Sequence, residues 1–285
     1  MYLVVSRRLL LLPLVAILAG CDVGMGGHLT ARATDEWTHT YQLKPGGELR
    51  ISNTNGIIEV EGVDGATLEV RAERIARGVS EEAARELLPR IVIKEDATPD
   101  RVSLSTERFS GIMLGAGFEV RYHVKAPKTT VVDVTNTNGQ VRLNGLSGRV
   151  NAHTTNGGVR GEALSGEVDA RSTNGGVVID LASVSSGHVK LHTTNGGVTL
   201  TLPETAKADL SASVTNGGIS IGEFQGLDVA EKSRRRFEAR LNGGGSDIEL
   251  QTTNGGIRIR PRNSVADTDK DDDARATILK DRKNP

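Results

Sequence analysis

Residues 150–179 read VNAHTTNGGVRGEALSGEVDARSTNGGVVI, and this stretch contains the same pattern twice. In each copy apolar and polar residues alternate, Thr-Asn-Gly-Gly follows, and a second alternating run begins with valine. Alternation with a period of two is typical of a strand that has one buried face. Asn-Gly suits a tight turn, because glycine has no Cβ and asparagine tolerates positive φ. The stretch therefore predicts a repeating unit of strand, turn and strand.

The tripeptide Thr-Asn-Gly occurs seven times along the chain. Its asparagines are Asn55, Asn138, Asn156, Asn174, Asn195, Asn216 and Asn254. The intervals between them are 83, 18, 18, 21, 21 and 38 residues, and fixed periods near twenty residues are typical of solenoids. The last interval is close to two repeat lengths, which we interpret as one rung that has lost its motif.

Positions aligned on these asparagines have constant chemistry. Six residues before the asparagine the residues are Leu49, Val132, Val150, Val168, Val189, Leu210 and Ile248. Four residues before it they are Ile51, Val134, Ala152, Ala170, Leu191, Ala212 and Leu250, and the position between these two columns is always polar. Three residues after it they are Ile58, Val141, Val159, Val177, Val198, Ile219 and Ile257, all of which are β-branched and suit a packed sheet.

Two architectures fit this pattern. Asn-Gly is also a signal for an antiparallel hairpin, so a meander competes with a coil of stacked rungs. The aligned columns favour the coil, in which like residues lie above one another. One rung buries about four aliphatic side chains, worth roughly 6–12 kcal/mol, which does not offset the entropy of ordering about eighteen residues. We therefore predict an all-β, repetitive β-solenoid, similar to a β-helix or β-roll, whose rungs are stable only when stacked.

The first twenty residues predict an export signal. Arg7 and Arg8 precede an apolar run, and Leu18-Ala19-Gly20-Cys21 resembles the lipobox of bacterial lipoproteins, with cleavage between Gly20 and Cys21. Cys21 is the single cysteine, so it is the predicted site of lipid attachment and no internal disulfide is possible. Several acyl chains, palmitate among them, would anchor the chain firmly to a membrane. We expect a location in the cell envelope, on the inner or the outer membrane.

The remaining chain divides into four predicted segments. Residues 21–36 are expected to be a lipidated N-terminus and linker, and residues 37–130 an N-terminal β region that caps the solenoid. Within the cap, strands are predicted over residues 67–75, 101–106 and 118–125. One short helix is predicted from Ser80, its N-cap, to Leu88, with Pro89 ending it. Residues 131–262 form the predicted solenoid, and the charged, aperiodic residues 263–285 a disordered tail.

Several of these motifs resemble the DUF4097 "putative adhesin" domain. They are Trp37 with the Gly46-Gly47 turn, LRISNTNG at 49–56, the helix led by Ser80, VKAP at 124–127, and LNGGGSDIEL at 241–250 followed by Thr253-Asn254-Gly255. The resemblance covers approximately residues 37–260. It implies a β-solenoid domain of cell-envelope proteins that has no enzymatic role.

Candidate chemistry is sparse. Stacking should bring His153, Arg171 and His192 into one exposed row. A stripe for an anionic ligand or a polysaccharide is one interpretation of this row, and an ordinary solvated strand face is the favoured one. Asp133 and Asp169 lie in a neighbouring outward column, so a carboxylate and an imidazole could meet there. No pair of acids recurs with the proximity that glycoside hydrolysis needs, and the six histidines form no metal-binding motif. We therefore predict no catalytic residue, no metal and no cofactor.

Composition excludes further classes of function. The net charge of −1 and the eight aromatic residues leave neither an electrostatic nor a stacking surface for nucleic acid. The favoured hypothesis is a membrane-anchored, non-catalytic lipoprotein that acts as an adhesin-like binding or scaffold module, with an envelope protein or a glycan as partner. The alternative is an accessory protein in envelope-stress sensing that contacts a membrane regulator. A polysaccharide-active β-helix enzyme is the remote alternative.

Overall fold

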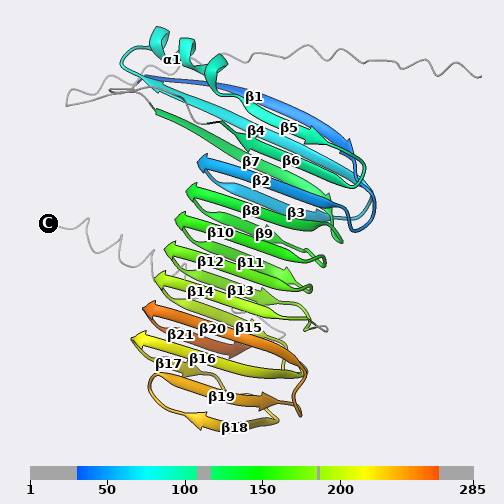
Figure 1. The fold of residues 1–285 in the computed structure, drawn as a ribbon, viewed down its shortest axis with the longest axis vertical. Helices are drawn as coiled ribbons and strands as arrows, with labels where there is room; N and C mark the ends of the chain where they lie inside the picture. Colours follow the sequence, from blue (N-terminus) through cyan, green and yellow to red (C-terminus); the bar gives the residue numbers. More distant parts are fainter. Residues whose placement is uncertain (1–30, 108–116, 185–186, 263–285) are drawn as a thin grey trace, which may run out of the picture.

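The computed structural model describes residues 31–107, 117–184 and 187–262, which form two long β-sheets that pack face to face (Figure 1). In spatial order the 10-stranded sheet contains β1 (Ala31–Gln42), β4 (Thr67–Gly78), β7 (Gly117–Pro127), β3 (Ile58–Val63), β9 (Val141–Asn144), β11 (Val159–Leu164), β13 (Val177–Leu181), β15 (Val198–Leu202), β21 (Ile257–Pro261) and β17 (Ile219–Ile221). The 11-stranded sheet contains β18 (Leu227–Lys232), β19 (Arg236–Leu241), β16 (Ala208–Asn216), β20 (Ser246–Asn254), β14 (Val189–Asn195), β12 (Val168–Asn174), β10 (Val150–Asn156), β8 (Val131–Asn138), β2 (Glu48–Asn55), β6 (Arg101–Thr106) and β5 (Ile93–Ala97).

Each repeat is one rung, with a strand in each sheet and the Asn-Gly turn between them. Neighbouring rungs pair in parallel and in register, so that Val150 lies between Val132 and Val168. Both apolar columns before the turn are buried over their whole length. The column after the turn is also buried, except for Ile219 in the terminal rung, which is partly exposed. The predicted all-β solenoid is confirmed, and the antiparallel meander is wrong.

The interior also holds a polar column that the sequence analysis missed. Two residues before each repeat asparagine lie Asn53, Asn136, Thr154, Ser172, Thr193, Val214 and Thr252. All seven are buried and all but Val214 are polar. Five of them donate a hydrogen bond to a glycine carbonyl of the preceding rung. The Oγ1 of Thr193 lies 2.7 Å from the carbonyl oxygen of Gly175, for example. Because a buried hydroxyl needs such a partner, these bonds fasten each turn to its neighbour from inside.

The last rungs are stacked out of sequence order. The strands β20 and β21 insert between the rung of β14 and β15 and the rung of β16 and β17 (Figure 1). The long final interval therefore contains no degenerate rung, and that interpretation is wrong. It contains β18 and β19, an antiparallel hairpin that covers the outer edge of β16. The chain then returns and places β20 between β14 and β16.

Two features require the repeat glycines: positive φ at the turn and close approach between rungs. A Cβ on Gly175 would collide with the carbonyl oxygen of Gly157, and one on Gly157 with that of Gly139. At Gly175 φ is 158°, and φ is also positive at Gly56 (121°) and Gly139 (140°). An L side chain at these positions would therefore be strained by the backbone conformation as well, in agreement with the sequence argument from positive φ.

The N-terminal strands β1 and β4 lie at one end of the stack of rungs (Figure 1). The helix α1 spans Glu81–Leu87, and Ser80 Oγ accepts the N-cap hydrogen bond from Ala83 N at 3.1 Å. The α-helix ends at Leu87, before Pro89 as predicted, and Pro89 lies in the first turn of the 3₁₀ helix η1 (Leu88–Arg90), where proline is tolerated. The predicted strands appear as β4, β6 and β7, with β4 and β7 longer than expected.

Two predicted boundaries need correction. Residues 31–36, assigned to a linker, form the first half of β1 and pair continuously with β4. The solenoid does not begin at residue 131, because β2 and β3 already form a rung that pairs in register with β8 and β9. The predicted signal peptide, Gly20, Cys21 and the tail at 263–285 lie outside the described residues.

Candidate functional site

The seven repeat asparagines form a continuous ladder of side-chain amides on the surface. Six of the seven Nδ2 atoms, all but that of Asn55 in the first rung, donate to the Oδ1 of the preceding rung. The distance is 2.7 Å from Asn138 to Asn55 and 2.8 Å from Asn156 to Asn138. The ladder follows the spatial order of the rungs, so Asn254 donates to Asn195 and Asn216 donates to Asn254. Each amide thus satisfies its neighbour, which makes these residues structural rather than catalytic.

The predicted row of His153, Arg171 and His192 exists in the strand register of β10, β12 and β14. Arg171 is already engaged, because its Nε and Nη2 each lie 2.7 Å from a carboxylate oxygen of Asp169. These hydrogen bonds, together with the negative charge of Asp169, raise the pKa of Arg171. Asp133 in turn contacts Arg50 at 3.3 Å. The two carboxylates therefore face arginines rather than the imidazoles, contrary to the sequence prediction.

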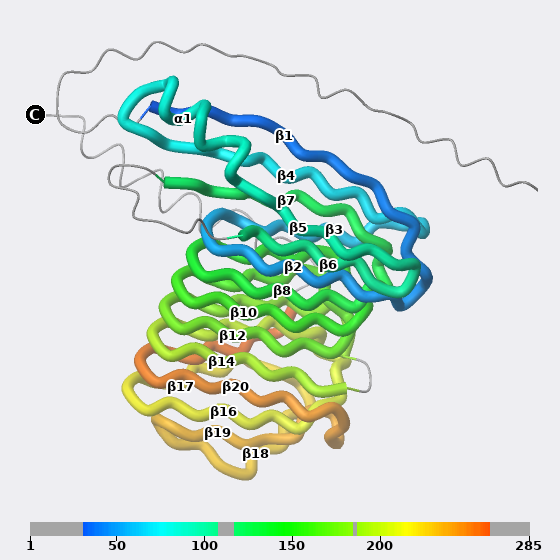
Figure 2. Tube along the Cα trace, turned by 45° about the horizontal axis from the view of Figure 1, so that its top comes forward, coloured from blue at the N-terminus to red at the C-terminus, as the bar shows by residue number. Residues whose placement is uncertain are grey.

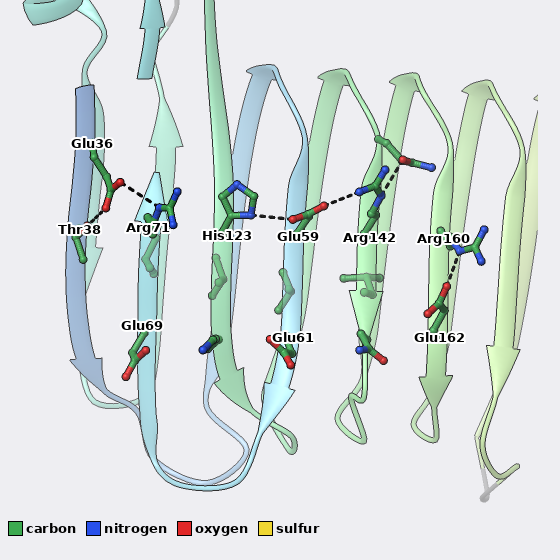
Figure 3. A pocket seen from close by; sticks show the side chains of 17 residues that line it. Glu36, Thr38, Glu59, Glu61, Glu69, Arg71, His123, Arg142, Arg160 and Glu162 are labelled. Atoms are coloured by element: carbon green, nitrogen blue, oxygen red, sulfur yellow. Dashed lines mark hydrogen bonds and ion pairs between the residues drawn. The ribbon is translucent and has the colours of Figure 1, made fainter. Parts of the chain in front are cut away.

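A larger site lies on the outer face of the 10-stranded sheet, where β1, β4, β7, β3, β9 and β11 run side by side (Figure 3). We call it the charged groove. Its polar lining residues are Glu36, Thr38, Glu59, Glu61, Glu69, Arg71, His123, Lys125, Gln140, Arg142, Asn144, Arg160 and Glu162. Alternation along each strand sends these side chains outward, while Val60, Val70 and Val124 lie buried beneath them.

One row of the charged groove is a chain of polar contacts centred on Glu59 (Figure 3). Its Oε2 lies 2.7 Å from Nδ1 of His123, and its Oε1 lies 2.7 Å from Nη1 of Arg142. Arg71 contacts Glu36 at 3.2 Å and Arg160 contacts Glu162 at 2.6 Å. These side chains are partly exposed, so each contact contributes little to stability. Their effect is to hold the charged groups in fixed positions.

The parallel row in the same groove carries charges that are not neutralised in this way. The strand register places Lys125 directly between Glu69 of β4 and Glu61 of β3. Within the described residues, no ion pair or hydrogen bond joins any of these three side chains to another group. They are therefore available to a ligand that brings hydrogen-bonding groups.

The described residues offer no arrangement for metal chemistry and no membrane span. No group of three or more His, Cys, Asp or Glu side chains among them could hold a metal ion. Within the same part of the chain, no helix is both long enough and apolar enough to cross a membrane.

The buried Tyr122 hydrogen-bonds Thr106 at 2.8 Å, and burial raises its pKa to about 12, so it is a neutral core group.

Sequence reasoning missed the charged groove, because three of its six strands belong to the cap. The strands β1 and β4 pair in an antiparallel register that joins residues 31–42 to residues 67–78, and neither strand carries the repeat pattern. The alternation of charge along residues 69–74 and 119–125 was a detectable signal for outward-facing strands, but not for which strands would be neighbours.

The fold and this surface define the class of protein: a capped solenoid of parallel rungs that exposes a fixed, charged face. Residues 122–260 match the family model described as Toastrack DUF4097, which supports the resemblance inferred from the sequence over this region. The expected resemblance began at residue 37, so the cap lies largely outside the match.

Comparison with solved structures gives distant likenesses. The chain is similar to a "putative cell adhesion protein" from Clostridium sporogenes at 12% identity, over 81% of this chain and 100% of that chain, with a TM-score of 0.39. It is also similar to a "putative adhesin" from Bacteroides fragilis at 12% identity, over 80% of this chain and 97% of that chain, with a TM-score of 0.35. No curated protein matches the chain.

Proposed function

We propose that this chain is a membrane-anchored, non-catalytic lipoprotein of the cell envelope that acts as an adhesin-like binding module. The observation that carries the proposal is the charged groove, in which Lys125 stands between two glutamates with all three side chains unpaired. Such a row can exchange hydrogen bonds with a hydroxyl-rich or charged ligand, for which an envelope glycan is the simplest candidate.

Replacing Lys125 by Glu is expected to weaken ligand binding by at least about tenfold, equivalent to 1.4 kcal/mol. The variant places three carboxylates side by side and removes the cation that a ligand would contact. Binding of the purified chain to a glycan array is the measurement, and Lys190→Glu, an exposed lysine on the opposite sheet, is the matched control. Equal binding by wild type and Lys125→Glu would move the site away from the groove. Absence of binding across the array would count against adhesion and favour the sensing alternative.

Replacing Cys21 by Ala is expected to release the protein from the membrane fraction. Acylation needs the thiol of Cys21, so the variant would lose all the acyl chains that are expected to anchor it. Cell fractionation followed by immunoblotting measures the distribution. Ser6→Ala, a change outside the lipobox, serves as the control and should leave the protein membrane-bound. Continued membrane association of Cys21→Ala would contradict the lipoprotein proposal without affecting the groove.

A further inference from the structure

The two sheets of the described region end in four edge strands, and three of these are blunted. The strand β17 has only three residues and β5 has five, while β18 is interrupted by a register shift between Val229 and Glu231. Short, bulged edges are the usual protection against pairing with another chain. These three edges therefore offer little backbone for a further strand.

The fourth edge, β1, lacks these protections. It has twelve residues, pairs with β4 without any register shift, and forms the border of the molecule at the cap end (Figure 2). It contains no proline, glycine or lysine. Within the described residues β1 pairs with β4 alone, so half of its backbone N–H and C=O groups point outward along about 40 Å of edge. The helix α1 contacts β1 and packs against β4 near Gly78, but it does not pair with the backbone along this border.

We propose that the edge of β1 pairs in antiparallel fashion with β1 of a second copy of this chain, about a two-fold axis at Trp37. The two 10-stranded sheets then become one continuous sheet. This inference rests on the edge geometry alone and is independent of the function of the groove.

The sequence of β1 complements itself in this register. Antiparallel partners share a face, so inward residues must meet inward residues and outward residues must meet outward ones. With Trp37 opposite Trp37, no like charges face each other. Asp35, which Arg74 of the same chain binds at 2.6 Å, lies opposite His39, which contacts Glu95 of the same chain at 3.1 Å, and Thr34 lies opposite Thr40. Ala33 lies opposite Tyr41, so a small side chain meets a large one. A shift of the axis to Glu36 would instead set Glu36 directly against Glu36 of the second copy, and like charges directly opposite are destabilising.

Pairing would also complete the charged groove. Glu36 and Thr38 of β1 form its outer wall, and in the pair this wall lies beside the same wall of the second copy. Two grooves would then share one surface, and two tethers would hold it, which raises avidity for a repetitive ligand without any new contact.

The test uses cysteines placed at Thr34 and Thr40 of the full chain, in which Cys21 is expected to be acylated. Both threonines are exposed and neither lines the groove. In the proposed register each introduced cysteine faces the other position of the second copy, at about 4.5–5.5 Å between Cα atoms, a separation that a disulfide spans. Mild oxidation of membranes carrying Thr34→Cys with Thr40→Cys should give a disulfide-linked dimer on a non-reducing gel. The single variants should give none, because the introduced cysteine then lies about 20 Å from the same cysteine of the second copy.

A second measurement does not depend on cysteine chemistry. The detergent-solubilised wild-type chain should have twice the mass of one chain by light scattering. Thr34→Lys with Thr40→Lys should have the mass of one chain. In the proposed pair the lysine at 34 of each copy would face the lysine at 40 of the other, and like charges directly opposite repel. The matched control, Thr199→Lys with Thr201→Lys on the interior strand β15, should remain dimeric. A wild-type chain of single mass, equal crosslinking in the single variants, or a dimer that persists with lysines at 34 and 40 would each overturn the proposal.

Discussion

Removal of residues 243–285 is expected to unfold β16–β19 as well as to delete β20 and β21. The deleted rung lies between β14 and β16 and is the parallel neighbour of both. Its four buried aliphatic side chains, Ile248, Leu250, Ile257 and Ile259, contribute roughly 6–12 kcal/mol of gross burial energy. Without it, β16 retains only the antiparallel hairpin of β18 and β19. Such a small remnant does not bury enough apolar surface to order itself.

Amide hydrogen exchange measures this result strand by strand. Amides of β16 and β19 should lose protection in the truncated chain, while those of β8 and β10 should keep it, because rungs contact only their neighbours. Truncation after Arg262, which leaves every described strand in place, is the control and should preserve protection throughout. Full protection of β16 after removal of 243–285 would mean that its rung docks directly on β14 and β15, and that the inserted rung is dispensable.

Replacement of Gly175 by Ala is expected to lower the free energy of unfolding by about 3 kcal/mol. The new Cβ would overlap the carbonyl oxygen of Gly157 in the rung before. Neither backbone can retreat easily, because Gly157 N donates to Asn174 O at 3.0 Å and Gly175 N donates to Asn195 O at 2.9 Å. For a protein of this size such a loss lowers Tm by about 6–12 °C, which thermal unfolding by circular dichroism would detect.

The next residue supplies the matched control. A Cβ on Gly176 would find its nearest atom, the carbonyl oxygen of Gly197, at 3.4 Å, which is ordinary contact. Gly176→Ala should therefore change the free energy of unfolding by less than about 1 kcal/mol. Equal melting temperatures for the two variants would show that the rungs can separate, and that close approach is not the reason for the glycine.

The repeat columns were predictable because their cause is local. Alternation within residues 150–152 fixes which side chain faces inward, and the spacing of Asn156 and Asn174 fixes how far the next rung lies along the chain. A slip of one residue between rungs is then excluded, since it would turn polar residues such as Asp169 toward the core. The helix at Ser80 was predictable for the same reason, because capping depends on residues three positions apart.

The order of the last two rungs was not predictable in this way. The rungs of Asn216 and Asn254 present nearly the same columns to a neighbour, and each could stack on Asn195 by side-chain chemistry alone. Residues 227–241 decide between them, because their hairpin pairs antiparallel with β16 and occupies its outer edge. Only the inner edge of β16 then remains for the returning strand β20.

The sequence by itself determined the rung: its turn at Asn-Gly, its two buried columns and its parallel stacking, all of which depend on residues within one repeat or at one repeat's distance. The tertiary structure alone decided the out-of-order insertion of β20 and the antiparallel cap. The cap in turn creates the groove in which Lys125 lies between Glu61 and Glu69. The physical reason is that strand alternation shows which face a residue occupies, whereas the neighbour across a sheet depends on which backbone edge is still free when the strand arrives.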